Sequence, residues 1–145
     1  MAITMKKMYN FPFESPLEEE VYYGLTNRGH KLHPQRWSWG HRIDLEVTNH
    51  SDRSKYIGLE CDGSMFHSSP SEIARDIKRQ RFLESKGWII VRVWSPDWWR
   101  NSTKELDRIE YIMNNLSEYT PEDYLPWKFA RPYLTDDYHS LITDW

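Results

Sequence analysis

The stretch Tyr56-Ile57-Gly58-Leu59-Glu60-Cys61-Asp62-Gly63 decides the fold, together with the earlier stretch Arg42-Ile43-Asp44-Leu45-Glu46-Val47. Both are short apolar runs with the composition of β-strands, and both carry acids. Alternation along the earlier strand predicts that Asp44 and Glu46 share one face, and that the other face carries Ile43, Leu45 and Val47. If the two strands are neighbours, Asp44, Glu60 and Asp62 converge. Because carboxylates this close repel one another, we expect a cation between them.

Helix-start patterns precede and follow these strands. In Ser15-Pro16-Leu17-Glu18 the serine suits the N-cap, the proline the first helical position and the glutamate a capping box. We therefore expect a helix over about residues 16–28, ended by Gly29. Ser69-Pro70-Ser71-Glu72 repeats the pattern and predicts a second helix that Gly87 ends.

The remaining strands complete one sheet. A first strand over residues 31–36, a turn at 37–40 and strands over 41–48 and 55–61 predict an antiparallel meander. Residues 88–94 are almost continuously apolar, as in a central strand buried on both faces. Because a helix separates this last strand from the third, we expect the two to pair in parallel.

The C-terminal third predicts one more helix and an extension. Ser95-Pro96-Asp97 indicates a turn, and Ser102 or Thr103 can cap a helix that reaches about Leu116. We assign Trp94, Trp98 and Trp99 to the core and to contacts with this helix. We expect three parts: an N-terminal arm or linker over 1–14, a folded domain over 15–117, and an aromatic, acidic extension packed on it over 118–145.

Composition limits the class of protein. The 145 residues include a single cysteine, Cys61, which excludes an internal disulfide. The chain has neither an apolar run long enough to span a membrane nor the apolar core of a secretory signal, so we expect a soluble, cytoplasmic protein. A net charge of −3 argues against a general nucleic-acid binder. However, residues 69–100 are basic and 101–145 acidic, which is compatible with a local phosphate-binding face.

Asp44, Glu60 and Asp62 are the strongest indication of chemistry. Hard oxygen ligands suit Mg²⁺ or Mn²⁺, and such an ion beside a scissile phosphate activates water and neutralises developing charge. The alternative is that Glu60 and Asp62 face solvent at a strand end and that Asp62-Gly63 is only a turn.

Several spaced motifs resemble a known group of enzymes. The order helix, three strands, helix, strand, with these acids, resembles the PD-(D/E)XK nuclease superfamily. More narrowly, it resembles the branch related to very-short-patch repair endonucleases, including the nuclease-like domain at the C-terminal end of large bacterial helicase-type proteins. The motifs are Ser15-Pro16-Leu17-Glu18, Arg42-Ile43-Asp44-Leu45, Glu60-Cys61-Asp62-Gly63 with His67 four residues later, and Gly87-Trp88. Over residues 15–110, the resemblance implies a restriction-endonuclease-like αβββαβ core with a mixed four-stranded sheet flanked by helices.

The resemblance also implies roles for single residues. Asp44 matches the metal-binding aspartate and Glu60 the second acid. Asp62 stands where the superfamily usually has lysine, so the lysine's task must go elsewhere, and we expect Asp62 to bind metal or orient water. His67 matches a histidine that assists phosphate or water chemistry, with a surface-loop histidine as the alternative. Glu18 matches an acid that reaches the metal, although it also has a capping role, with Glu19 as the fallback.

Further residues are candidates for contacts with nucleic acid. Arg75, Lys78 and Arg79 fall on one side of the second helix, where they could bind phosphates or replace the missing lysine, or form an ordinary solvated face. Gln35 matches a position where the family tends to keep glutamine, and could contact phosphate or water. Trp37, with Trp39, could stack on bases or pack in the core. We expect structural or exposed positions for four histidines: His30, His33, His41 and His50.

Two functions remain open at this point. One is a Mg²⁺- or Mn²⁺-dependent DNA endonuclease that acts in repair or in defence against foreign DNA. The other is a catalytically inactive nuclease-fold module that binds nucleic acid or protein. The missing lysine and the negative net charge favour the second, whereas the three retained carboxylates favour the first. DNA is the expected partner, with a helicase or another domain of a larger protein as a further candidate.

Overall fold

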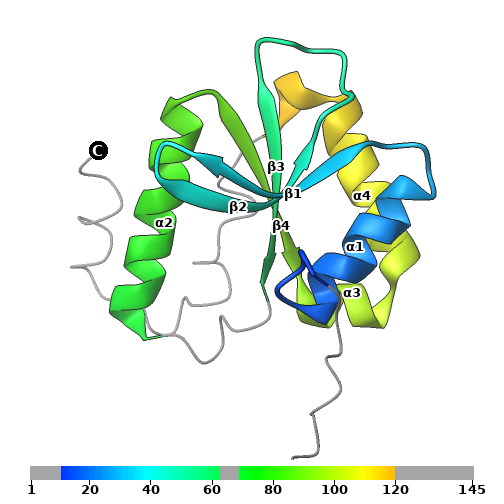
Figure 1. Cartoon of the computed structure of the whole chain (residues 1–145), viewed down its shortest axis with the longest axis horizontal. Helices are drawn as coiled ribbons and strands as arrows, with labels where there is room; N and C mark the ends of the chain where they lie inside the picture. The colour runs from blue at the N-terminus through cyan, green and yellow to red at the C-terminus, as the bar shows by residue number, and fades with distance from the viewer. Residues whose placement is uncertain (1–10, 63–68, 120–145) are drawn as a thin grey trace, which may run out of the picture.

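The fold is one mixed sheet with helices on both faces (Figure 1). The computed structural model describes residues 11–62 and 69–119. In chain order the elements are α1 (Pro16–Thr26), β1 (Leu32–Ser38), β2 (His41–Val47), β3 (Tyr56–Asp62), α2 (Pro70–Ser85), β4 (Trp88–Trp94), α3 (Ser95–Arg100), α4 (Ser102–Asn114) and a 3₁₀ turn (Leu116–Glu118). Helix α2 covers one face of the sheet, and α1, α3 and α4 lie on the other (Figure 1). The expected restriction-endonuclease-like αβββαβ core is confirmed.

The strand order is β1-β2-β3-β4. β1 pairs antiparallel with β2 and β2 with β3, whereas β3 pairs parallel with β4. The meander and the parallel pairing are therefore confirmed. The prediction that residues 88–94 form a central strand is wrong, because among the described strands β4 lies at an edge. It is apolar on both faces because α2 packs on one side and α3 on the other.

The helix ends follow the capping residues, with two corrections. Ser15 Oγ accepts a hydrogen bond from the Glu18 amide at 3.1 Å, and α1 ends two residues before the predicted boundary. The α4 helix is capped by Asn101 rather than by Ser102 or Thr103, since the Asn101 side chain accepts from the Lys104 amide. Ser95-Pro96-Asp97 begins the short helix α3 instead of a turn, because proline is well tolerated in the first turn of a helix.

The core consists of two clusters separated by the sheet. The cluster on the α1 and α4 side contains apolar residues of these helices and of the sheet. Its sheet residues are Leu45, Val47, Ile57, Leu59, Val91 and Val93. On the α2 side lie Ile43, Leu83, Trp88 and Ile90. Trp94 and Trp98 are buried as expected, but the prediction for Trp99 is wrong, since 56% of it is exposed. Successive residues of a helix point in different directions, so α3 buries Trp98 and exposes its neighbour.

Strand β2 breaks its alternation at Asp44. Ile43 packs in the α2-side cluster, whereas Leu45 and Val47 pack in the opposite one. The prediction that all three share a face is therefore wrong for Ile43. Gln35 and Asp44 are not among the paired residues of β1 and β2, although their neighbours on both sides are paired. Gln35 has a positive φ of 54°. At this local irregularity the Asp44 side chain accepts a hydrogen bond from the Cys61 amide of β3.

Some predictions fall on residues that the structure does not describe. His67, most of the expected arm over 1–14 and most of the extension over 118–145 lie outside the described ranges, so the boundaries of the three parts stay predictions. Within the arm range, Phe13 is buried and packs against the Tyr22 ring. No helix in the described ranges combines the length and apolar character that a membrane span requires.

Candidate active site

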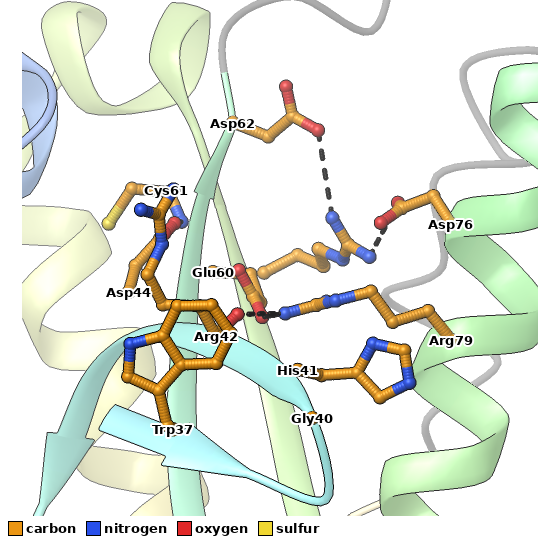
Figure 2. A pocket seen from close by; sticks show the side chains of 11 residues that line it. Trp37, Gly40, His41, Arg42, Asp44, Glu60, Cys61, Asp62, Asp76 and Arg79 are labelled. Carbon is orange, nitrogen blue, oxygen red and sulfur yellow. Dashed lines mark hydrogen bonds and ion pairs between the residues drawn. The ribbon is translucent and has the colours of Figure 1, made fainter. Parts of the chain in front are cut away.

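A pocket of about 610 Å³ lies between the sheet and α2 (Figure 2). Strands β2, β3 and β4, the β1–β2 hairpin and α2 all contribute side chains to it. Asp44 enters from the irregular point of β2, and Glu60 and Asp62 come from the end of β3. The lining residues are Trp37, Gly40, His41, Arg42, Asp44, Glu60, Cys61, Asp62, Asp76, Arg79 and Arg92.

Asp44 and Glu60 form the acidic centre of this pocket. Burial, and then the negative charges of Glu60 and Glu18, raise the pKa of Asp44 from 3.8 to about 8. The Cys61 amide donates to Asp44 Oδ2 at 2.9 Å, which holds the carboxyl group against β3. The Cys61 thiol has a pKa well above its ordinary value because of burial and of these acids, as expected for a packed rather than a nucleophilic cysteine. The surroundings of Asp44 therefore disfavour its ionised form.

Two arginines bind the other side of the acids. Arg79 of α2 donates to Glu60 Oε1 at 2.7 Å and to the Arg42 carbonyl. Arg92 of β4 is buried, and lies 2.6 Å from Asp76 and 3.6 Å from Asp62. Figure 2 shows Asp62 directed away from Asp44, at the top of the pocket. Glu60 and Asp62 are therefore not solvent-facing strand-end acids, since each has an arginine partner.

A comparison with protein-family models identifies the family of the chain. Residues 17–113 match the model of the family REase_MTES_1575. The chain belongs to this family. The match covers the whole αβββαβ core and includes Asp44, Glu60 and Asp62, and the family is one of restriction endonuclease-like nucleases. No curated protein and no solved structure matches the chain.

The donor set of this family member fits a divalent cation in part. Across residues 11–62 and 69–119, no group of three or more His, Cys, Asp and Glu side chains is arranged to hold a metal ion. Mg²⁺, however, commonly binds through one or two carboxylates and takes its other ligands from water and phosphate. Asp44 and Glu60 supply such a pair in the acidic pocket. Asp62 does not belong to the pair, because it faces Arg92.

Glu18 and Gln35 lie outside the lining of the acidic pocket. Glu18 is buried, and burial raises its pKa. Its carboxylate accepts from Ser15 Oγ at 3.1 Å and from Gln35 Nε2 at 2.6 Å. Glu18 acts electrostatically on Asp44, although neither it nor Gln35 lines the pocket. The buried Gln35 Oε1 has no hydrogen-bond partner among the described residues. The capping and the site-directed interpretations of Glu18 are thus compatible.

The candidates for nucleic-acid contacts lie beside the same pocket. Arg75, Lys78 and Arg79 line a second hollow, which adjoins the first through Arg79 and His41. Trp37 lines the acidic pocket and Trp39 the second hollow, and both are mostly exposed. The core-packing interpretation of these two tryptophans is therefore wrong.

Sequence reasoning does not identify several residues of the pocket, among them His41, Asp76 and Arg92. His41 was expected to be structural or exposed, but it lines both hollows. Asp76 and Arg92 received no role. Arg92 did carry a signal, since a charge inside the apolar run of a buried strand requires a partner. The identity of that partner depends on how α2 packs on β4, which the sequence does not reveal.

Proposed function

We propose that the chain is a Mg²⁺- or Mn²⁺-dependent DNA endonuclease that hydrolyses phosphodiester bonds. The proposal includes membership of the PD-(D/E)XK superfamily, in the branch close to very-short-patch repair endonucleases. The observation that supports it is the pairing of Asp44 and Glu60 in one pocket, where burial, and then the charges of Glu60 and Glu18, raise the pKa of Asp44 to about 8. A bound divalent ion would supply positive charge against the phosphate and lower the pKa of an attacking water.

The residues of the chain supply binding and orientation. Asp44 and Glu60 would hold the cation, and the charge of Glu18 acts on Asp44. Asp62 positions Arg92 by their ion pair rather than acting as a ligand. His67 remains the proposed proton-transfer group, on the resemblance alone.

Arg79 is the proposed replacement for the missing lysine. Its guanidinium contacts Glu60, so it carries positive charge to the wall where the substrate phosphate would lie. A guanidinium has five N–H donors, and the same Nη2 atom makes both contacts described, which leaves donors for phosphate oxygens. Arg75 and Lys78, which line the adjoining hollow, extend this positive surface along α2. DNA repair, or defence against foreign DNA, is the proposed setting, alone or joined to a helicase-type protein.

A supercoiled-plasmid assay tests the proposal. We expect nicking or linearisation with Mg²⁺ or Mn²⁺ and none with EDTA. Asp44→Asn and Glu60→Gln should lower the rate at least about 100-fold, since each removes charge that holds the cation. Glu46→Gln is the matched control, because Glu46 is a buried acid of the same strand that pairs with Arg36 outside the pocket. Cleavage that persists in both site variants would refute the assignment.

The same assay weighs the inactive-module alternative. The ion pairs of Glu60 with Arg79 and of Asp62 with Arg92 favour that alternative, because they occupy carboxylate oxygens. If plasmid binds but no divalent ion supports cleavage, the chain is a binding module. In that case Arg79→Gln should not strengthen DNA binding, and cleavage should stay absent.

A further inference from the structure

The second hollow has a composition that the acidic pocket lacks. It measures about 530 Å³ and lies between the β1–β2 hairpin and α2. Its apolar wall consists of Trp39, His41 and Phe82, whose rings contact one another edge to face: the Trp39 and Phe82 centroids are 6.4 Å apart, and those of His41 and Phe82 are 5.6 Å apart. Trp39 nevertheless remains 63% exposed. The hollow thus presents an aromatic surface that the described fold leaves accessible.

The hairpin holds Trp39 in a costly backbone conformation. Ser38 pairs with His41, and the two residues between them have positive φ angles, 52° at Trp39 and 77° at Gly40. Two-residue turns of this kind favour Asn or Asp followed by Gly. A bulky residue at positive φ is strained, and strain of this kind clusters at binding and catalytic sites. Its position here directs the indole towards α2 instead of into a core.

Cations surround the aromatic wall. Arg75, Lys78 and Arg79 line the hollow, and Lys86 Nζ lies 4.4 Å from the centroid of a Trp39 ring. An apolar peptide would supply no counter-charges for Arg75 and Lys78. A nucleotide satisfies both parts, because its base stacks on aromatic rings and its phosphates pair with Lys and Arg.

Arg79 connects the hollow to the acidic centre. It lines both cavities and donates to Glu60. A DNA strand whose phosphate lies at Asp44 and Glu60 would therefore pass a neighbouring nucleotide over the aromatic wall. In an intact duplex that base is stacked and paired, and it becomes available only when it is unpaired or extruded.

We propose that this aromatic and basic hollow binds an unpaired nucleobase of DNA beside the phosphate to be cut, so that the substrate class is DNA with at least one unpaired base. The inference rests on the proposed function only where it places the base beside a phosphate that is cleaved. Base binding itself does not need cleavage. Trp39 is the stacking platform, and Arg75 and Lys78 bind the flanking phosphates.

Binding measurements with Ca²⁺ in place of Mg²⁺ test the proposal without cleavage. The probes are two fluorescent DNA duplexes of one sequence, one fully paired and one with a single unpaired 2-aminopurine. We expect wild-type protein to prefer the second duplex about 10-fold, the effect of one stacked base, and to change the 2-aminopurine fluorescence. Trp39→Asn should abolish both effects while it keeps the hairpin, since asparagine suits a positive φ. Trp39→Phe should restore part of the preference.

Trp99→Ala is the matched control, because Trp99 is also exposed but lies on α3, outside both hollows. Equal affinity for the two duplexes, an unchanged preference in Trp39→Asn, or the same loss in Trp99→Ala would overturn the inference. Tighter binding of an RNA strand of the same sequence would overturn the assignment to DNA. A preference that depends on Trp39 in a protein that never cleaves would instead refute the proposed nuclease activity alone.

Discussion

Asp44 shows how a single residue combines a structural irregularity with a site. The neighbours Ile43 and Leu45 pack in opposite clusters, and the sheet register passes over Asp44. Its carboxyl group lies against the Cys61 amide and beside Glu60. Natural sequences depart from regular patterns mainly at functional or strained positions. The broken alternation is thus consistent with a role for Asp44 beyond packing.

Stability should depend on pH through Asp44. Its pKa is about 8 in the folded protein and 3.8 in the reference state. Between these values the folded state binds the extra proton, so the free energy of unfolding falls as the pH rises. Asp44→Asn lacks this titration, so its free energy of unfolding relative to wild type should rise by about 3–4 kcal/mol from pH 5 to pH 8. Urea unfolding in EDTA measures the difference, and an equal gap at both pH values would contradict it.

Gly58 should tolerate no side chain. A Cβ there would lie 2.8 Å from Ile43 Cγ2 and 3.1 Å from Ile90 Cδ1. Gly58→Ala should therefore lower the free energy of unfolding by about 1–3 kcal/mol through overpacking. Ile43→Ala removes the clashing methyl group, so the double variant should lose clearly less than the sum of the two single losses. Strict additivity in urea unfolding would show that the clash is not the cause.

At the scale of elements, local sequence patterns predict most of the fold. The serine caps, the proline at each helix start and the glycines at positive φ locate α1 and α2, and alternation with turns locates the meander. Two errors have a physical origin. Pro96 is compatible with a turn or with a first helical turn, and only packing of Trp98 selects the helix. An apolar strand such as β4 reports burial on both faces and not its place in the sheet order.

The cap of α1 should be worth more than that of α2. Ser15 Oγ accepts from the Glu18 amide and also donates to the buried Glu18 carboxylate. Ser69 Oγ accepts from the Glu72 amide at 3.3 Å, at an exposed helix end. Ser15→Ala should therefore cost more than the usual cap loss of about 1 kcal/mol, and Ser69→Ala should cost less than Ser15→Ala. Thermal unfolding of both variants measures this order, and the reverse order would contradict it.

At the scale of the whole molecule, a buried arginine joins three elements around the pocket. Arg92 of β4 contacts Asp76 and Gln80 of α2 and Asp62 of β3. These residues are distant in sequence, so composition and periodicity could predict neither the network nor the orientation of Asp62. The convergence of Asp44 and Glu60 could be predicted, because it follows from the pairing of their strands. The ion pairs of Glu60 and Asp62 could not, because they depend on how distant elements pack.

Removal of Arg92 should be far more costly than removal of an exposed arginine. Arg92→Met leaves two partly buried acids and the buried Gln80 amide without their partner and should cost about 3–5 kcal/mol. Arg100→Met, which breaks the exposed pair with Asp97, should cost about 1 kcal/mol or less. Urea unfolding at pH 7 compares the two. Equal losses would mean that the Arg92 network contributes no more than a surface pair.

Titration of Mn²⁺ into the DNA-free protein, followed by electron paramagnetic resonance, tests the central claim most directly. If Asp44 and Glu60 share a divalent cation, wild type and Glu46→Gln bind one ion with the same affinity, and Asp44→Asn and Glu60→Gln bind it at least about 10-fold more weakly. Binding that is unchanged in Asp44→Asn, or absent from wild type at millimolar Mn²⁺, would contradict the account.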